Sequence, residues 1–330
     1  MDRRRFLLTS LAAAFAAPDA ARAQQTGKPP RIAVLNPGPP EYINDPETCP
    51  NGFRQGLRDL GYVDGQNVQL EYRHARGDTT RLPALAGELV RLAPDVIWTH
   101  SAEAIVAAKE ATRSIPIVFG VAINSVEEGF VASLSRPGGN VTGLELRDIE
   151  LTAKRLELLR EALPNLTRVA VLVNPAVRGH ERVPPEVEEQ ARALGVQLQW
   201  VPARTHERFE AAFAEISKAG AQAVMIMEHS MFARARQRLT AMALKRKLPT
   251  ISGGRHFAEA GSLIAYGAFP RELCQRSAGL VDRIVKGAKP ADLPVELADR
   301  FYLVINLKTA KALGLTIPPS LLARADRVIE

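Results

Sequence analysis

From residue 31 onwards, short hydrophobic runs alternate with longer segments in which hydrophobic positions recur every three or four residues. Continuous short runs bounded by turn residues are typical of buried strands, and the longer period is typical of helices. Strands that alternate with helices are typical of parallel α/β units. The pattern therefore predicts an α/β fold built on parallel sheets.

The same order of elements occurs twice. Strands are predicted at 31–37, 67–72, 95–101, 115–120 and 140–146, and again at 168–175, 196–201, 223–230, 248–253 and 262–266. In both series the first strand ends in Asn-Pro, the third ends in His-Ser, and the fourth opens with a hydrophobic residue and proline. The first helix of each series ends in Leu-Gly, at Gly61 and Gly195, where glycine suits a helix end that needs positive φ. The repeated order predicts two similar, doubly wound lobes.

The chain after Tyr266 does not repeat. A helix at 151–163 and this tail are expected to cross between the halves. We expect one lobe from 31–147 plus about 268–293, and a second from 148–267 plus about 294–330. Several crossings would form a multi-strand hinge on which the lobes close over a ligand.

Composition agrees with two folded domains. The 330 residues are 46% hydrophobic and 24% charged, as in ordinary globular proteins. The formal net charge is +7, but basic residues are scattered among acidic ones, so we predict no nucleic-acid partner. The two cysteines, Cys49 and Cys274, are too far apart for a CxxC motif. They are either two unpaired thiols or, in an oxidising compartment, a disulfide.

The first residues have the pattern of a secretory signal. Arg3-Arg4-Arg5 precede a hydrophobic run at 6–17, and Ala21-Arg22-Ala23 is a small-x-small cleavage site. We predict a signal peptide at 1–23, cleaved before Gln24, either of the twin-arginine type or a general secretory signal. No later run is apolar enough to span a membrane, so the mature chain is expected in the periplasm.

Several segments carry a family resemblance: Asn51–Val68, Val131–Gly143, Lys154–Leu159, Gly287–Glu296 and Val304–Ser320. They resemble segments of ABC-transporter substrate-binding proteins of the uncharacterised tryptophan/tyrosine-type group. The resemblance covers nearly all of the mature chain. It implies a type I periplasmic-binding-protein fold and a receptor for amino acids or related small carboxylates. Its implied partners are that small-molecule ligand and an inner-membrane ABC permease.

The chain departs from the family at two places near the predicted cleft. It has Asn124-Ser125-Val126 where the family often has Asp-Pro-Val, and His256-Phe257 where the family often has Glu-Phe. These departures concern the identity of the ligand more than the role of the protein.

Candidate ligand contacts follow from the architecture, because open parallel sheets bind ligands outside the carboxyl ends of their strands. In the first lobe they are Asn36, Thr99, His100, Ser101, Ala102, Asn124, Thr142 and Gly143; in the second they are Asn174, Glu228, His229, Ser252 and Tyr266.

Most of these residues have an alternative role. Ser101 either holds a ligand carboxylate at a helix N-terminus or caps its own helix. Glu228 either meets a ligand ammonium or is a solvated loop carboxylate. His229 either contacts the ligand or packs at a strand end, and Tyr266 either stacks on the ligand or packs in the wall. The asparagines that precede proline either contact the ligand or hold turns.

The competing function is a two-lobed nucleotide-sugar enzyme, which also pairs two such sheets. The sequence has no GxxxxGK[ST] or GxSxG motif and no GxGxxG loop after the first strand. It also has no HExxH, CxxC or His-x-His metal pattern. A ligand-sensing domain without an importer is a further alternative. We predict a solute-binding component of an ABC importer, with no catalytic residue, metal or cofactor.

Overall fold

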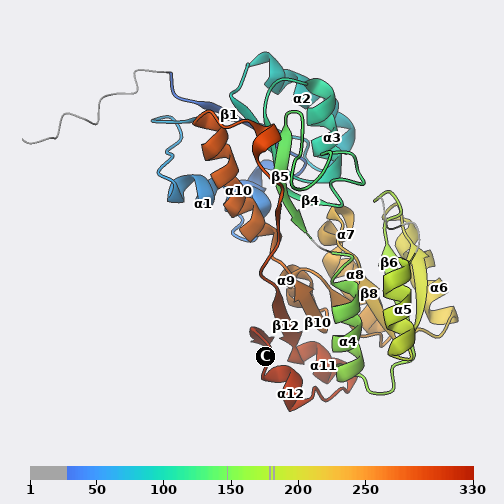
Figure 1. The fold of residues 1–330 in the computed structure, drawn as a ribbon. Helices are drawn as coiled ribbons and strands as arrows, with labels where there is room; N and C mark the ends of the chain where they lie inside the picture. The colour runs from blue at the N-terminus through green and yellow to red at the C-terminus, as the bar shows by residue number, and fades with distance from the viewer. Residues whose placement is uncertain (1–27, 147, 178–179, 181–182) are drawn as a thin grey trace, which may run out of the picture.

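The structure is a computed structural model that describes residues 28–146, 148–177, 180 and 183–330. The predicted signal peptide at 1–23 lies outside the described residues. Figure 1 shows two lobes, each with a sheet covered by helices, and the chain passes between them more than once. This arrangement confirms the predicted α/β class with two parallel-sheet lobes.

The first sheet has six strands in the order β11-β5-β4-β3-β1-β2, all parallel to their neighbours. The strands are β1 (Arg31–Asn36), β2 (Gln69–His74), β3 (Val96–Thr99), β4 (Ile117–Ile123), β5 (Val141–Leu146) and β11 (Glu296–Leu297). Residues 32–35 of β1 are fully buried, as expected for a parallel strand whose sheet is covered on both faces.

Helices cover both faces of this sheet. Ile32 and Val34 pack in a core with α1 and α10, whereas Ala33 and Leu35 pack in a core with α2 and α3, because successive side chains of a strand point to opposite faces. The elements are η1 (Pro40–Ile43), α1 (Cys49–Asp59), η2 (Thr79–Arg81), α2 (Leu82–Arg91), α3 (Ala102–Ala111), α10 (Pro270–Val285) and η3 (Pro290–Asp292).

The second sheet has seven strands in the order β13-β12-β10-β9-β8-β6-β7. The strands are β6 (Arg168–Val173), β7 (Gln197–Pro202), β8 (Ala223–Ile226), β9 (Thr250–Ser252), β10 (Ile264–Gly267), β12 (Tyr302–Asn306) and β13 (Arg327–Ile329). β12 runs antiparallel to β10, and the other paired strands are parallel.

Helices also cover both faces of the second sheet. Val169 and Val171 pack in a core with α4 and α12, whereas Ala170 and Leu172 pack in a core with α6 and α8. The helices are α4 (Thr152–Ala162), α5 (Pro185–Ala193), α6 (Arg208–Lys218), α7 (Ser230–Arg234), α8 (Arg236–Lys245), α9 (Arg255–Glu259), α11 (Leu307–Leu313) and α12 (Pro319–Leu322).

The predicted duplication extends to topology. In each lobe the first five strands lie in the spatial order second, first, third, fourth, fifth. Gly61 and Gly195 have φ of 84° and 68°, as predicted for both helix ends. Several boundaries differ by a few residues: β3 ends at Thr99 and not at 101, and β4 continues to Ile123 and not only to 120. The largest difference is at β8, which ends at Ile226, because the residues up to 230 leave the sheet before α7.

Three segments connect the lobes: from β5 to α4, from β10 to α10, and from β11 to β12. β11 pairs with β5 in the first sheet. The last crossing therefore falls between Leu297 and Tyr302, a few residues beyond the position of about 293 expected from the sequence, because β11 still pairs in the first sheet.

A buried ion pair joins two of the segments that connect the lobes. Arg155 Nη1 lies 2.6 Å from Asp148 Oδ1, and both side chains are 1% exposed. Arg155 Nε also donates to the carbonyl of Tyr266, at 2.9 Å. One guanidinium therefore links the first crossing, where Asp148 lies, to the end of β10, which leads into the second.

The returning helix α10 is held closely to the first lobe. A Cβ atom on Gly56 of α1 would lie 2.1 Å from the carbonyl oxygen of Gln275, so glycine allows the two helix backbones to approach. Cys49 and Cys274 form a disulfide between the same helices, with their Cα atoms 5.2 Å apart. The structure therefore supports the disulfide over two unpaired thiols.

We predict that the disulfide is a major source of stability, because it closes a loop of 225 residues in the unfolded chain. The double variant C49A/C274A should lose about 2–5 kcal/mol of unfolding free energy, measured by urea denaturation. Dithiothreitol should destabilise the native protein and leave the double variant unchanged. Peptide mapping of the exported, non-reduced protein that found both thiols free would contradict the prediction.

Candidate functional site

The carboxyl ends of strands from the two lobes lie near each other where the lobes meet, and we call this region the cleft. Glu47, before α1 in the first lobe, forms an ion pair with Arg255, which opens α9 in the second. Glu103 of α3 and Arg234 of α7 each influence the pKa values of both His100 and His229, although one histidine belongs to each lobe. The polar ends of β3 and β8 therefore share one environment.

In the first lobe, Asn36 organises the edge of the sheet. Its Oδ1 accepts from the Gly38 N–H at 3.0 Å and lies 3.3 Å from His100 Nε2. Its Nδ2 lies 3.0 Å from His74 Nδ1 and donates to the Pro39 carbonyl at 3.3 Å. Asn36 is fully buried and all four of its bonding positions are used, so it holds a turn and two histidines and has none left for a ligand.

The second lobe repeats this arrangement. Asn174 Oδ1 accepts from the Ala176 N–H at 2.9 Å, and its Nδ2 lies within 3.4 Å of both ring nitrogens of His229. His229 Nδ1 also accepts from the Met231 N–H at 3.1 Å, which makes this histidine the cap of α7. Each lobe therefore places an asparagine after its first strand against a histidine after its third.

Three histidines near these strand ends are neutral at pH 7. Burial lowers the pKa of His100, His229 and His256 to about 4 in each case, opposed for the first two by Glu103. Burial also lowers the pKa of His74, with help from Arg76. The cleft therefore presents uncharged imidazoles at neutral pH, which act as hydrogen-bonding groups and not as cations.

Ser101 has a buried hydroxyl without a partner. It precedes α3, yet its side chain does not bond to the helix it precedes, and its Oγ has no hydrogen-bond partner. Its backbone has φ 77° and ψ 148°, a conformation that L-residues rarely adopt. The plain-cap alternative for Ser101 is therefore not the arrangement found here.

Glu228 lies at the hinge side of the cleft. Its backbone N–H donates to Asp148 Oδ2 at 2.9 Å, and its Oε1 has no hydrogen-bond partner. A cavity of about 10 Å³, roughly the space for one water, lies among Glu228, Asp148, Arg155 and Gly253. Burial and the neighbouring Asp148 raise the pKa of Glu228 to about 7, opposed by Arg155. The residue is buried, which excludes the solvated-loop alternative.

Other predicted contacts lie inside the sheets. Thr99 Oγ1 donates to the Leu35 carbonyl at 2.8 Å, and Thr142 Oγ1 donates to the Leu293 carbonyl at 2.7 Å. Gly143 lies in mid-strand, where a Cβ atom would be 2.2 Å from the Phe119 carbonyl oxygen. These residues serve packing between strands, because β5 continues to Leu146 before it reaches the cleft.

The remaining predicted contacts lie at strand ends. Ala102 opens α3, and Asn124 follows β4 with φ 54°. Ser252 ends β9 with a fully buried hydroxyl that has no hydrogen-bond partner. Tyr266 on β10 has its ring centroid 6.3 Å from that of Phe301, in the third crossing, so it packs against the hinge.

Sequence reasoning missed three features. His74 ends β2 and follows the same strand-end rule that selected His100. His256 carries a buried Nε2 without a partner. Arg155 is a charged residue four positions before Leu159 on the buried stripe of α4, and a charge at such a position signals a buried partner.

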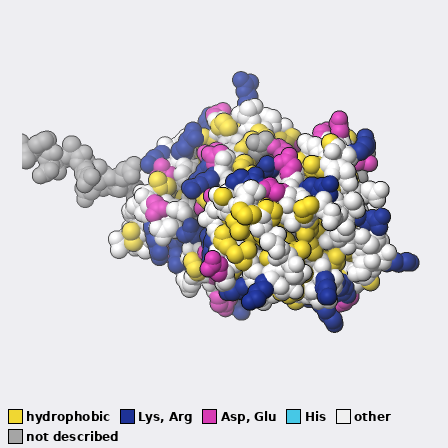
Figure 2. Space-filling model, turned by 90° about the horizontal axis from the view of Figure 1, so that it is seen from below, with side chains coloured by type: hydrophobic (Ala, Val, Ile, Leu, Met, Phe, Trp, Pro, Cys, Tyr) yellow, Lys and Arg dark blue, Asp and Glu magenta, His cyan; other side chains and the backbone are white. Residues whose placement is uncertain are grey.

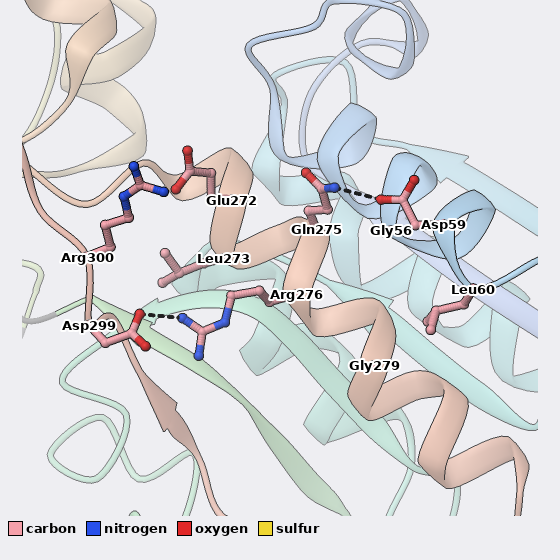
Figure 3. A pocket seen from close by; sticks show the side chains of 10 residues that line it. All are labelled: Gly56, Asp59, Leu60, Glu272, Leu273, Gln275, Arg276, Gly279, Asp299 and Arg300. Carbon is pink, nitrogen blue, oxygen red and sulfur yellow. Dashed lines mark hydrogen bonds and ion pairs between the residues drawn. The ribbon is translucent and has the colours of Figure 1, made fainter. Parts of the chain in front are cut away.

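A cavity larger than the one beside Glu228 lies away from this cleft. It measures about 450 Å³ and lies in the first lobe, beside α1 and α10. Figure 3 shows Asp59 bonded to Gln275 and Arg276 paired with Asp299 along its wall. Because the charged groups of these two pairs already have partners, the cleft between the lobes is the better functional candidate.

The described residues also bear on three other kinds of feature: a charged binding surface, a membrane-spanning helix and a metal site. Figure 2 shows Lys and Arg side chains interspersed with Asp and Glu over the face seen from below. No described helix is both long and apolar enough to cross a bilayer. Across residues 28–146, 148–177, 180 and 183–330, no three His, Cys, Asp or Glu side chains gather as a metal site requires.

Comparisons with known proteins agree with the geometry. A tyrosine-binding protein of Clostridioides difficile (strain R20291) is 25% identical over 264 residues, which are 80% of this chain and 76% of the relative. A conserved domain protein from Vibrio cholerae is 27% identical, with a TM-score of 0.83 over 91% of this chain and 100% of that one. The ABC domain from Streptococcus pneumonia in complex with L-Trp is 23% identical, with a TM-score of 0.83 over 92% of this chain and 100% of that one.

The family described as ABC transporter substrate binding protein matches residues 47–329. This range includes all three crossings and every strand of both sheets except β1. The match spans well over half of the chain, and the fold is the one that the resemblance implied. The chain belongs to the ABC transporter substrate binding protein family.

Proposed function

We propose that the protein captures an amino acid, an aromatic acid or a related small carboxylate between its lobes, outside the cytoplasm. It then delivers this ligand to an inner-membrane ABC permease and performs no chemistry on it. The relatives whose names mention tyrosine or L-Trp support an amino acid as the first ligand class to test.

The observation that carries the proposal is the buried, unpartnered hydroxyl of Ser101 at the start of α3. An unpaired buried hydroxyl costs free energy, and a ligand oxygen beside it would recover that cost. Ser101 directly precedes the ten-residue helix α3, whose first N–H groups have no partner within the helix, and a helix N-terminus favours an anion. We therefore assign the ligand carboxylate to Ser101 and Ala102.

The cellular location rests on two further observations. The Cys49–Cys274 disulfide suits an oxidising compartment. The predicted signal at 1–23, whether of the twin-arginine or the general secretory type, would take the chain there, although it lies outside the described residues. Both support export to the periplasm, where a solute-binding protein meets its permease.

The test is a thermal-shift screen over L-tyrosine, L-tryptophan, other amino acids, aromatic acids and short carboxylates, followed by calorimetry on the compounds that bind. A ligand of the folded state should raise Tm by an amount that grows with its concentration over its dissociation constant. If no compound raises Tm and the purified protein instead turns over a substrate, the proposal is wrong.

Variants of Ser101 test ligand affinity separately from the stability of the protein. Ser101→Ala should weaken ligand binding by about threefold to tenfold, the effect of one hydrogen bond of 0.5–1.5 kcal/mol. Its unfolding free energy without ligand should not fall and should rise by up to about 1 kcal/mol, because the buried hydroxyl has no partner and does not cap α3. Calorimetry and urea denaturation measure the two quantities.

A second variant sharpens this prediction. Ser101→Gly should weaken binding in the same way and raise stability by about 1 kcal/mol, since glycine adopts positive φ without strain. Ser114→Ala, at an exposed position of the same lobe, is the control and should change neither. Undiminished affinity in both Ser101 variants would refute the assignment of the carboxylate.

Glu228 predicts a pH dependence of stability. Its pKa is raised from 4.5 to about 7 in the folded protein, so the folded state binds this proton more tightly than the unfolded chain. That contribution to stability is fully present below about pH 4.5 and is lost as pH rises through 7. Glu228→Gln should match the native protein near pH 5 and exceed its stability at about pH 8.5, by on the order of 3 kcal/mol.

Thermal and urea unfolding across this pH range measure the effect. Glu189→Gln, at an exposed position of α5, is the charge-matched control and should follow the native protein at every pH. A Glu228→Gln profile parallel to that of the native protein would contradict the buried, protonated carboxyl.

A further inference from the structure

The turn after β1 determines which way the Asn36 amide points. The Gly38 backbone N–H can only donate, so the atom 3.0 Å away must be the oxygen Oδ1. The Pro39 carbonyl can only accept, so the group 3.3 Å from it must be Nδ2. Two backbone groups of fixed polarity therefore orient the amide without reference to the histidines.

The amide in turn determines where two imidazoles carry their protons. Asn36 Nδ2 is a donor, so His74 Nδ1, 3.0 Å from it, must accept and the His74 proton lies on Nε2. Asn36 Oδ1 is an acceptor, so His100 Nε2, 3.3 Å from it, must donate and His100 Nδ1 keeps a lone pair. Both rings are neutral at pH 7, because burial lowers their pKa values.

The second lobe fixes its histidine independently. The Met231 N–H donates to His229 Nδ1 at 3.1 Å, so Nδ1 is an acceptor, while His229 Nε2 lies 3.3 Å from Asn174 Nδ2 and is covered by that amide. His100 Nδ1 and His74 Nε2–H are therefore the ring groups whose polarity Asn36 fixes, while Glu103 and Arg234 influence the pKa values of both His100 and His229.

We propose that Asn36 is a positioning residue that fixes the tautomers of His74 and His100, so that the cleft offers a set pattern of hydrogen-bond donors and acceptors. His100 Nδ1 then accepts from a ligand donor, and His74 Nε2–H donates to a ligand acceptor. This pattern suits a zwitterionic or neutral polar molecule that carries both kinds of group, as an amino acid does. The ligand part of this inference rests on the proposed function; the tautomers do not.

The direct test is long-range ¹H–¹⁵N NMR of the ¹⁵N-labelled protein at pH 7, which reports the protonated ring nitrogen of each histidine. The chain has six histidines, so His74→Gln and His100→Gln variants assign the two signals. We expect the proton on Nε2 in both rings. A proton on Nδ1 in either ring, or averaging between tautomers, would overturn the inference.

Asn36→Asp tests the role of the amide at nearly constant shape. It replaces Nδ2 with a carboxylate oxygen that faces His74 Nδ1 and favours imidazolium. The pKa values of His74 and His100 should rise by about one unit or more, a tenfold change in proton affinity, while the signal of His229 stays in place. Unchanged pKa values for both rings would exclude a positioning role.

The control is Asn165→Asp, at an exposed position before β6 and at the opposite end of its sheet from the cleft. It adds the same charge and should leave all three histidines unchanged. If Asn36→Asp does not fold, the spectrum of the native protein still decides the tautomers.

L-tyrosine is the probe for the ligand part. Asn36→Asp should weaken its binding by about tenfold or more, whereas Asn165→Asp should not. Equal affinity in both variants would refute the ligand part of the inference. Failure of the native protein to bind any compound of the screen would count against the proposed function, and the NMR results would still stand.

Discussion

Two backbone hydrogen bonds support the chemistry of the cleft. The N–H groups of Gly38 and Ala176 bond to the side-chain oxygens of Asn36 and Asn174, directly after the first strand of each lobe. A parallel sheet leaves polar groups at its carboxyl edge that the next strand cannot satisfy, and these asparagines satisfy them from within the turn. Once each amide is oriented, the histidine beside it has a defined partner.

Contacts of α10 and of Arg155 join the connecting segments to the lobes. α10 returns from the second lobe and is joined to α1 by close backbone packing and by the Cys49–Cys274 disulfide. The Asp148–Arg155 pair joins the first crossing to β10. The three crossings are therefore the segments at which the lobes would hinge in the closure that we propose.

Much of the fold was predictable, because it depends on patterns that repeat in the sequence. The duplicated Asn-Pro, Leu-Gly and His-Ser positions predicted two lobes of one topology. The last crossing and β11 were harder to place, because a strand of two residues leaves almost no periodic signal.

The site was less predictable, because contacts between distant residues determine it. Thr142 lies near a strand end in sequence, but its hydroxyl bonds to Leu293, which is 151 residues away. The choice between free thiols and a disulfide likewise required the approach of α10 to α1. Ser101, His100 and His229 each lie between a strand and the next helix, whereas His74 and His256 were missed; whether a ligand contacts any of them stays a prediction.

A crystal structure of the protein with the compound that gives the largest thermal shift tests the central claim most directly. The account predicts one ligand between the lobes, with its carboxylate at Ser101 and the start of α3, and with His100 and His229 on opposite sides. A ligand found in the cavity beside α1 and α10, or bound to a single lobe with the other lobe apart, would contradict it.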